Sequence, residues 1–122
     1  MAPDITSFTD RYLNLWNEPD PQAREAIVAE LWAKDGTNST PSLEARGLEA
    51  ITARVTRSYD SYVGTGTYLF RLARVPVSHH DAIRLDWEMV TRDTGAVASA
   101  GTEFLLLNDE GRIMSDHQFL EP

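Results

Sequence analysis

The sequence predicts an α+β fold, in which three N-terminal helices pack on a curved, mainly antiparallel sheet. Apolar residues recur at helical spacing through the first half of the chain, and after residue 66 the spacing changes to a period of two. The turns between the later segments are short, which favours antiparallel neighbours in the sheet. The length of 122 residues suits a single hydrophobic core, so we expect one domain over residues 1–122.

The first two helices are expected over residues 5–16 and about 21–34, because each segment carries an apolar stripe. Asp20 can cap the second helix, and the adjacent proline suits its first turn, where a backbone N–H would be unpaired anyway. The letters KDG then predict the end of this helix, with Gly36 in a left-handed cap.

A polar segment separates the second helix from the third. Residues 37–46 are interrupted by Pro41, which is typical of a short strand at a sheet edge or of a loop. The third helix is expected from about Leu48 to Tyr62, and the glycines that follow, beginning with Gly64, end it. Its apolar stripe consists of Leu48, Ile51, Val55, Tyr59 and Tyr62.

Four strands account for the second half of the chain. They are TYLFRLARVPV (67–77), AIRLDWEMVTR (82–92), VASAGTEFLLL (97–107) and RIMSDHQFL (112–120). The second alternates apolar and charged residues, whereas the third is apolar on both faces. A strand of the latter kind needs cover on both sides. The helices would cover one side, and a second copy of the chain would cover the other, so we expect a homodimer through the sheet.

The composition bounds the partners. Acidic residues outnumber basic ones by 19 to 11, for a net charge of −8, which argues against nucleic acid and against an anionic membrane. The absence of cysteine excludes disulfides and thiolate chemistry. No signal peptide or long apolar run is visible, so we expect a soluble, cytoplasmic protein. We expect no metal and no cofactor, since the adjacent His79 and His80 lack the spacing of metal ligands.

Glu103 is the first candidate site residue, because it is an acid in an apolar strand. It shares a face with Ser99 and Gly101. In a central strand its carboxyl would be buried, and burial raises a carboxyl pKa, which would make it a neutral donor or a general acid. The alternative is a structural ion pair with Arg71 or Arg84.

Asp116 and His117 occupy the last strand. Asp116 shares a face with Met114, Gln118 and Leu120, and it is either a base on a cavity wall or a solvent-facing acid. His117 points to the opposite face, because neighbours in a strand alternate, so the two cannot easily form a dyad. We expect His117 at a dimer interface or in solvent.

The aromatic residues also allow two interpretations. Tyr12 lies on the apolar stripe of the first helix, as a core tyrosine or as a donor to a ligand carbonyl. Trp16, Trp32 and Trp87 are either core residues or flat apolar walls for a polycyclic or aromatic ligand.

The order of elements resembles the nuclear transport factor 2-like superfamily. The segments RYLNLW, AIVAELWAKDGTNSTPSLEARGLEAI and GTEFLLLNDEGRI resemble its SnoaL-like and ketosteroid isomerase-like branches. This resemblance covers nearly the whole chain. It implies a cone-shaped α+β roll that encloses an apolar pocket with a few polar groups at its depth.

The resemblance also implies roles for single residues. Tyr12 falls at the place of an oxyanion-hole tyrosine, Glu103 at that of a protonated carboxylic acid, and Trp32 at that of a supporting tyrosine. Thr40 stands where ketosteroid isomerases keep their proton-abstracting aspartate, so isomerisation by that mechanism is not expected. Asp116 is the candidate replacement for the missing base.

We therefore expect a pocket for a small apolar carbonyl-bearing ligand, polyketide-like or steroid-like, with possible cofactor-free isomerase, cyclase or dehydratase activity. Tyr12, Glu103 and Asp116 are the expected catalytic residues. The expected ligand-binding residues are Trp16, Trp32, Thr40, Val55, Tyr59, Leu85, Trp87, Ser99, Gln118 and Leu120. The alternatives are a non-catalytic module that dimerises or docks another domain, and a protein that carries a ligand without converting it.

Overall fold

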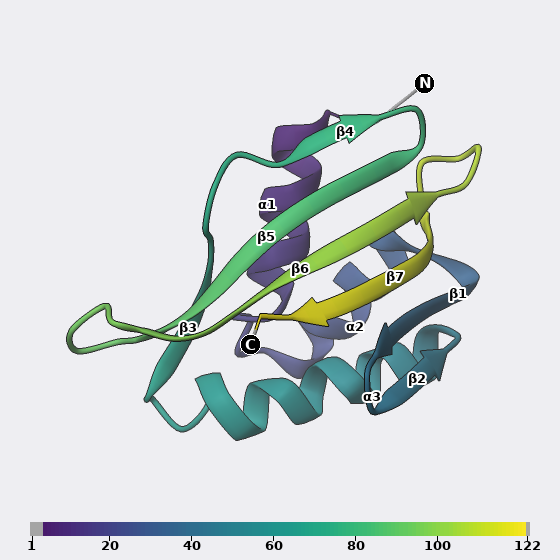
Figure 1. The fold of residues 1–122 in the computed structure, drawn as a ribbon. Coiled ribbons are helices and arrows are strands. Elements are labelled where there is room, and N and C mark those ends of the chain that lie inside the picture. The colour runs from purple at the N-terminus through teal and green to yellow at the C-terminus, as the bar shows by residue number, and fades with distance from the viewer. Residues whose placement is uncertain (1–3, 122) are drawn as a thin grey trace.

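A computed structural model describes residues 4–121 of the chain (Figure 1). The helices are α1 (Ile5–Leu15), α2 (Pro21–Leu31) and α3 (Leu48–Ser58), the last followed by a π-helical turn (Tyr59–Val63). The strands are β1 (Trp32–Thr40), β2 (Leu43–Arg46), β3 (Tyr68–Leu72), β4 (Val77–His79), β5 (Ala82–Thr91), β6 (Val97–Leu107) and β7 (Ile113–Leu120). Among the described residues, no helix has the length and apolar character needed to cross a membrane.

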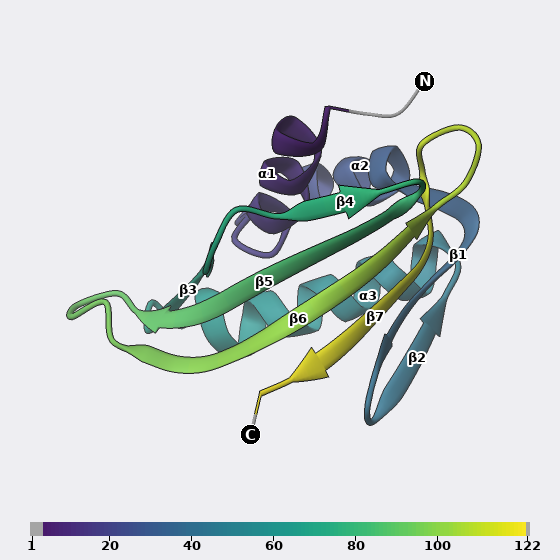
Figure 2. The same ribbon diagram turned by 45° about the horizontal axis from the view of Figure 1, so that its top comes forward.

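The strands form one curved, mixed sheet in the order β2-β1-β7-β6-β5-β3, with β4 also paired to β5. All pairs are antiparallel except β1 with β7, which is parallel. The three helices lie against one face of this sheet, and Figure 2 shows the opposite face without a covering layer. The expected α+β architecture is confirmed.

The boundary between α2 and β1 differs from the expected one. The helix ends at Leu31, and Trp32 is already extended, with φ −95° and ψ 147°. Gly36 lies within β1 instead of capping the helix. A Cβ atom at Gly36 would stand 2.6 Å from the backbone oxygen of Ile113. The glycine therefore serves the close approach of β1 to β7, not a left-handed cap.

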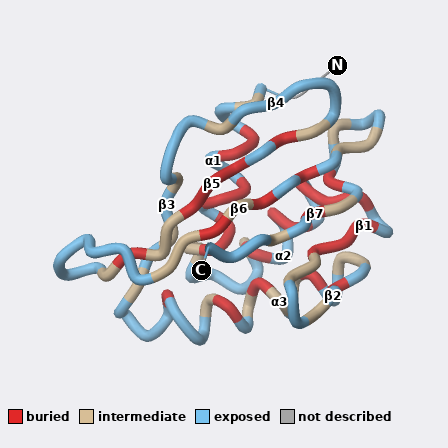
Figure 3. Tube along the Cα trace, in the orientation of Figure 1, coloured by how far each residue is buried: buried red, intermediate tan, exposed pale blue. Residues whose placement is uncertain are grey.

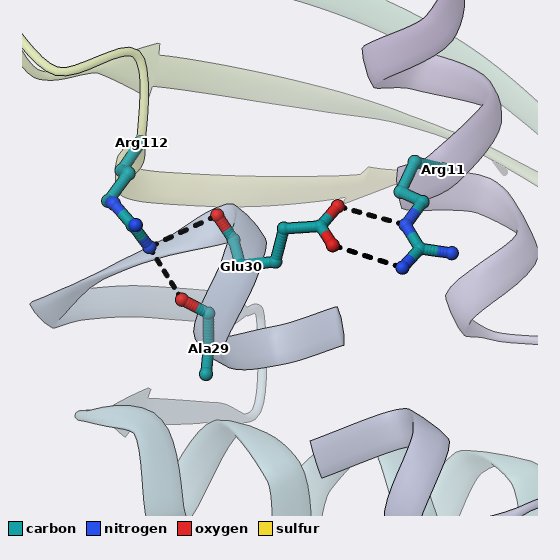
Figure 4. A network of polar contacts seen from close by, with 4 residues as sticks. All are labelled: Arg11, Ala29, Glu30 and Arg112. Carbon is teal, nitrogen blue, oxygen red and sulfur yellow. Dashed lines mark hydrogen bonds and ion pairs between the residues drawn. The ribbon is translucent and has the colours of Figure 1, made fainter. Parts of the chain in front are cut away.

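Arg112, in the turn between β6 and β7, fixes the end of α2 (Figure 4). Its Nη1 donates hydrogen bonds of 2.6 Å to the carbonyl oxygen of Ala29 and 3.2 Å to that of Glu30. These carbonyls belong to the last turn of the helix, where no intrahelical donor remains. The Glu30 carboxylate in turn accepts two hydrogen bonds from Arg11 of α1. The end of α2, where β1 begins, is thus tied to both neighbours.

The expected strand 67–77 is two strands. β3 pairs with one end of β5, and β4 pairs with the other, so that Val77 lies opposite Arg84. Pro76 lies in the intervening segment and has no N–H to donate to a ladder. The strand is therefore interrupted at the proline, which cannot donate a backbone hydrogen bond to the sheet.

The third helix also departs from the expected continuous stripe. It gives way at Tyr59 to the π-helical turn, which adds about one residue to the local turn and shifts the buried face. Val63 is consequently buried, whereas Tyr62, which we expected on the apolar side, is 42% exposed.

The hydrophobic core lies between the helices and the sheet (Figure 3). Ile83, Leu85 and Trp87 of β5 are buried as expected, although Asp86 on the opposite face is buried too. On β6 the two faces differ more than expected, because Leu105 is buried while Phe104 is exposed. The outer face of the sheet therefore presents apolar side chains to its surroundings.

Candidate functional site

Three buried polar side chains meet between the helices and the sheet. They are Tyr12 from α1, Glu103 from β6 and Asp116 from β7, each no more than 1% exposed. The Tyr12 hydroxyl lies 2.6 Å from Asp116 Oδ2 and 3.2 Å from Glu103 Oε1. Burying polar groups is costly unless they are hydrogen-bonded, and this network supplies bonds to all of these groups except Asp116 Oδ1, which has no partner in the described part of the chain. The structure thus brings the three expected catalytic residues together.

Two further side chains complete the network. Trp87 Nε1 donates a 2.8 Å hydrogen bond to Glu103 Oε2, and Asn38 Nδ2 donates one of the same length to Asp116 Oδ2. Asn38 was not among the expected site residues. It is placed there by the parallel pairing of β1 with β7, in which Asn38 lies opposite Asp116. No local signal in the sequence predicts that pairing.

A shift in register sets the inward direction of Asp116. Leu106 pairs with Ser115, but Leu107 pairs with Ile113, so one residue of β7 is unmatched. Ile113 therefore points inward with Asp116, whereas Met114 is exposed. Our expectation that Met114 shares the face of Asp116 is wrong for this reason.

The two buried carboxyls of the network affect each other's titration. Burial, and then the charge of Asp116, raise the pKa of Glu103 well above its ordinary value. Burial also raises the pKa of Asp116, but hydrogen bonds from Glu103, Tyr12 and Asn38 oppose that rise. Glu103 consequently holds its proton more strongly than Asp116 does.

Tyr12 remains neutral between the two acids. Burial, followed by the nearby charges of Asp116 and Glu103, raises its pKa well above its ordinary value. A neutral hydroxyl has one proton, and the shorter distance assigns its hydrogen bond to Asp116. The proton of Glu103 can then be donated to the Tyr12 oxygen or to Asp116 itself.

A cavity of about 500 Å³ adjoins this network. It is lined by Tyr12, Leu13, Trp16, Thr40, Pro41, Ser42, Leu43, Arg54, Ser58, Tyr62, Phe70, Trp87, Met89, Ser99, Glu103, Gln118 and Leu120. Tyr62 and Leu120 are both exposed, so the mouth of the cavity lies beside them. Asp116 does not line it. Tyr12 and Glu103 therefore separate the charged carboxylate from any ligand.

Six of the expected ligand-binding residues line the cavity: Trp16, Thr40, Trp87, Ser99, Gln118 and Leu120. Four do not. Trp32 packs behind Tyr12, with ring centroids 5.8 Å apart, and its Nε1 donates to the backbone oxygen of Thr37. The Tyr59 ring faces Arg24 instead. Val55 and Leu85 are fully buried in the core.

Several lining residues lie outside the expected set, and Arg54 is the most informative of them. It lies on α3 three residues after Ile51, beside the apolar stripe that the sequence predicts. A basic residue next to a buried stripe is the sequence signal that could have identified Arg54 as a cavity residue. The turn residues Pro41 and Ser42 had no such signal, because their position depends on the β1–β2 hairpin.

The alternative ion pairs of Glu103 do not form. Arg71 contacts Glu88 at 3.1 Å, and the Arg84 guanidinium lies 3.5 Å from Asp86 instead. His117 lies on the exposed outer face, as its place in the strand predicts. Between residues 4 and 121, no group of three or more acidic or histidine side chains is arranged to hold a metal ion.

Comparisons with known proteins identify the family. No family model matches the sequence, and no curated protein matches it. Among solved structures, a candidate isomerase of the SnoaL-like family from Agrobacterium tumefaciens strain C58 matches with a TM-score of 0.86. The identity is 30%, over 96% of this chain and 97% of that one. The chain belongs to the SnoaL-like family.

Other solved structures share the fold of this SnoaL-like protein. A candidate polyketide cyclase from Sinorhizobium meliloti matches with a TM-score of 0.70 at 16% identity, over 93% of this chain and 94% of that chain. A nuclear transport factor 2-like protein of unknown function from Exiguobacterium matches with a TM-score of 0.67 at 23% identity, over 93% and 98%. At these identities the likeness shows the fold alone. It agrees with the architecture that the resemblance implied for this SnoaL-like chain.

Proposed function

We propose that this SnoaL-like protein binds a small apolar carbonyl compound, polyketide-like or steroid-like, and catalyses cofactor-free proton transfer on it. One observation carries the proposal: a buried carboxyl pair that shares a proton adjoins a cavity of about 500 Å³ with Glu103 on its wall. Isomerisation, cyclisation and dehydration of carbonyl compounds all require such a transfer. The candidate isomerase from Agrobacterium supports the first of these.

Glu103 is the group that exchanges the proton with the ligand. Asp116, the base expected from the sequence, does not line the cavity, so we assign the base role to Glu103. When the shared proton moves to Asp116, Glu103 becomes a carboxylate. It then takes a proton from the carbon next to the ligand carbonyl, and the electron pair stays on the ligand as an enolate. Return of the proton to another carbon completes an isomerisation.

Tyr12 stabilises the enolate oxygen in this scheme. Its hydroxyl donates to Asp116 while that carboxylate is charged. Once Asp116 takes up the shared proton, the hydroxyl is released and can donate to the ligand oxygen. A donor held in a dry site acts on developing charge much more strongly than the same donor in water.

Exchange of ligand protons with solvent deuterium tests the proposal. 2-Tetralone in deuterated buffer, followed by NMR, reports proton abstraction without requiring the natural product. We expect the wild-type protein to accelerate exchange, and Glu103→Gln to lose about 10²-fold or more of that rate. Glu88→Gln, the same change on the outer face of β5, is the control and keeps the wild-type rate. Equal deuterium-exchange rates for wild type and Glu103→Gln would contradict the proposal.

We also propose that a second copy of the chain packs against the outer face of the sheet to form a homodimer. Phe104, Leu106 and Phe119 are 46%, 51% and 56% exposed there. Beside them, Asp86 lies within 3.7 Å of Arg74 and 3.5 Å of Arg84, so both signs of charge border the apolar surface. A surface with both signs can complement a twofold-related copy of itself. This observation also favours the non-catalytic alternative, a dimerisation module, should deuterium exchange fail.

A further inference from the structure

Arg54 gives the cavity a positive charge. Among the described residues that line it, Arg54 and Glu103 are the only members of the Asp, Glu, Lys and Arg group. Glu103 does not pair with the arginine, because its two oxygens contact the Tyr12 hydroxyl and Trp87 Nε1. A guanidinium in the lining of this cavity is a specific feature of a chain whose net charge is −8.

No protein group among residues 4–121 pairs with Arg54. Its Nε is buried and has no hydrogen-bond partner. Arg11 and Arg71, by contrast, contact carboxylates at 2.9 and 3.1 Å. On α3 the neighbours one turn away are Ala50 and Ser58, neither of which is acidic. A buried donor without an acceptor is uncommon in folded proteins, and the guanidinium has no carboxylate partner among these residues.

Trp16 holds the guanidinium at the cavity wall. The Arg54 Cζ lies 5.3 Å from the centroid of the Trp16 ring, within the range of a cation–π contact. This contact occupies the face of the guanidinium, and because Nε is buried, an acceptor in the cavity would bind the Nη groups. The Trp16 ring also lies 6.1 Å from that of Tyr12. An apolar surface therefore separates the cationic end of the cavity from the proton-transfer end.

We propose that the ligand of this cavity is a carboxylate, whose anionic group binds the Arg54 guanidinium while its carbonyl lies at Glu103. The orientation rests on the proposed function, whereas the anion site rests on Arg54 alone. Guanidinium and carboxylate match in a bidentate geometry, which favours this pairing over a single-point contact. A phosphate monoester carries close to two charges, of which the single guanidinium can compensate only one. The proposed ligand is thus an apolar keto acid that fits a cavity of about 500 Å³.

Calorimetric titration with matched naphthalene probes tests the anion site. The probes are 2-naphthylacetate, its uncharged methyl ester and 2-naphthyl phosphate. We expect wild type to bind the carboxylate at least about tenfold more tightly than the ester, as one charge-assisted contact allows. The phosphate should bind more weakly than the carboxylate. Tighter binding of the phosphate, or no binding of any probe, would overturn the proposal.

Two substitutions on the same helix localise the effect. Arg54→Met should remove the preference for the carboxylate over the ester. Arg57→Met removes the same charge from an exposed position outside the cavity lining and should keep the preference. Arg54→Lys keeps the charge without the planar fork and should retain part of the preference. Survival of the full preference in Arg54→Met, or its loss in Arg57→Met, contradicts the assignment, provided circular dichroism shows each variant folded.

The Glu103→Gln variant separates this inference from the proposed function. It should lose deuterium exchange of 2-tetralone but keep the carboxylate preference, because Arg54 is unchanged. Exchange without a carboxylate preference in wild type would overturn the anion site and leave the proton-transfer function standing. A carboxylate preference without deuterium exchange would overturn the proton-transfer function and leave the anion site standing.

Discussion

Glu103 and Asp116 place a protonation equilibrium inside the folded protein. The pKa of Glu103 is raised, first by burial and then by the charge of Asp116, which hydrogen bonds from Tyr12 and Asn38 stabilise. Each member therefore influences the others through a single shared proton. Substitution of one residue should change the titration of the whole group, so its members are best tested by variants that keep their shape.

Stability should depend on pH through Glu103. The folded-state pKa is raised above the ordinary value of 4.5, so above about that pH the native state retains a proton that the unfolded chain has lost. The contribution of this group is therefore complete below pH 4.5 and falls as pH rises through its folded-state pKa. Gln cannot titrate, so Glu103→Gln should flatten the decline in the free energy of unfolding.

Urea unfolding of wild type and Glu103→Gln between about pH 5 and pH 9 measures this difference. Glu88→Gln supplies the control, because Glu88 lies on the outer face beside Arg71. A slope for Glu103→Gln equal to that of wild type would mean that Glu103 is ionised in the folded protein.

Tyr12→Phe should destabilise the fold through one lost hydroxyl. Asp116 Oδ2 would keep only its hydrogen bond from Asn38, and an under-satisfied buried group costs about 1–3 kcal/mol. Tyr62→Phe is the matched control, since Tyr62 also lines the cavity but is 42% exposed. Chemical denaturation of both variants provides the comparison. Similar losses in the two would show that the Tyr12 hydroxyl contributes no more than an exposed one.

Residue-level reasoning from the sequence located part of this site. Glu103 could be identified because a strand alternates, so its face followed from its neighbours. Asn38 could not, because its role depends on the parallel pairing of β1 with β7. The residues of β7 that point inward could not all be predicted either, because the local sequence gives no sign of the register shift near Ile113.

At the scale of elements, β5 and β6 must approach closely where Trp87 lies opposite Gly101. A Cβ atom at Gly101 would stand 2.6 Å from Trp87 Cζ2 and 2.9 Å from the backbone oxygen of Phe119. The absence of a side chain therefore leaves room for the indole ring, whose Nε1 holds Glu103. A glycine in a strand interior, usually a weakness, here positions the site.

Gly101→Ala should displace Trp87 and weaken its hydrogen bond to Glu103. Overpacking of this kind typically costs about 1–3 kcal/mol, measurable by denaturation and by a change in tryptophan fluorescence. The cost should be smaller when the same substitution is made in a Trp87→Phe background, because the indole atoms that clash are absent. Equal costs in the two backgrounds would show that the ring is not the obstacle.

The elements themselves were largely predictable, but their junctions were not. The stripes on α1 and α3 and the alternation of β5 follow from side-chain periodicity. The change from α2 to β1 at Trp32 depends on pairing with Ile113, which is remote in sequence. The π-helical turn after Ser58 similarly reflects the packing of Val63, not a local propensity.

At the scale of the whole molecule, the proposed dimer would form through the outer face of the sheet. Phe104 and Phe119 pack edge to face there, with ring centroids 5.6 Å apart, and both are exposed. If a second copy covers them, light scattering coupled to size exclusion should give twice the chain mass of 13.7 kDa. Phe104→Glu should give monomers, because it would bury an unpaired charge in the interface.

Val75→Glu is the control for assembly, since Val75 is 84% exposed outside the sheet strands. It should leave the mass of the dimer unchanged. A wild-type protein that elutes with the mass of one chain at micromolar concentration would exclude this mode of dimerisation.

The overall architecture was the most predictable level of all. Helices followed by a meander of strands specify an α+β layer arrangement, because the short turns force neighbouring strands to pair. The one parallel pair is the exception, since no turn connects β1 to β7 and the sheet order alone creates it.

That sheet order has a consequence during synthesis. β7 lies between β1 and β6, although it follows both along the chain, so both neighbours leave the ribosome before it. Until β7 emerges, each of them has an open edge, and open edges recruit foreign strands. The contact between Tyr12 and Asp116 spans 104 residues, so it too forms only then. A nascent chain of this protein is therefore most exposed to aggregation, and to capture by chaperones, just before Asp116 meets Tyr12 and Glu103.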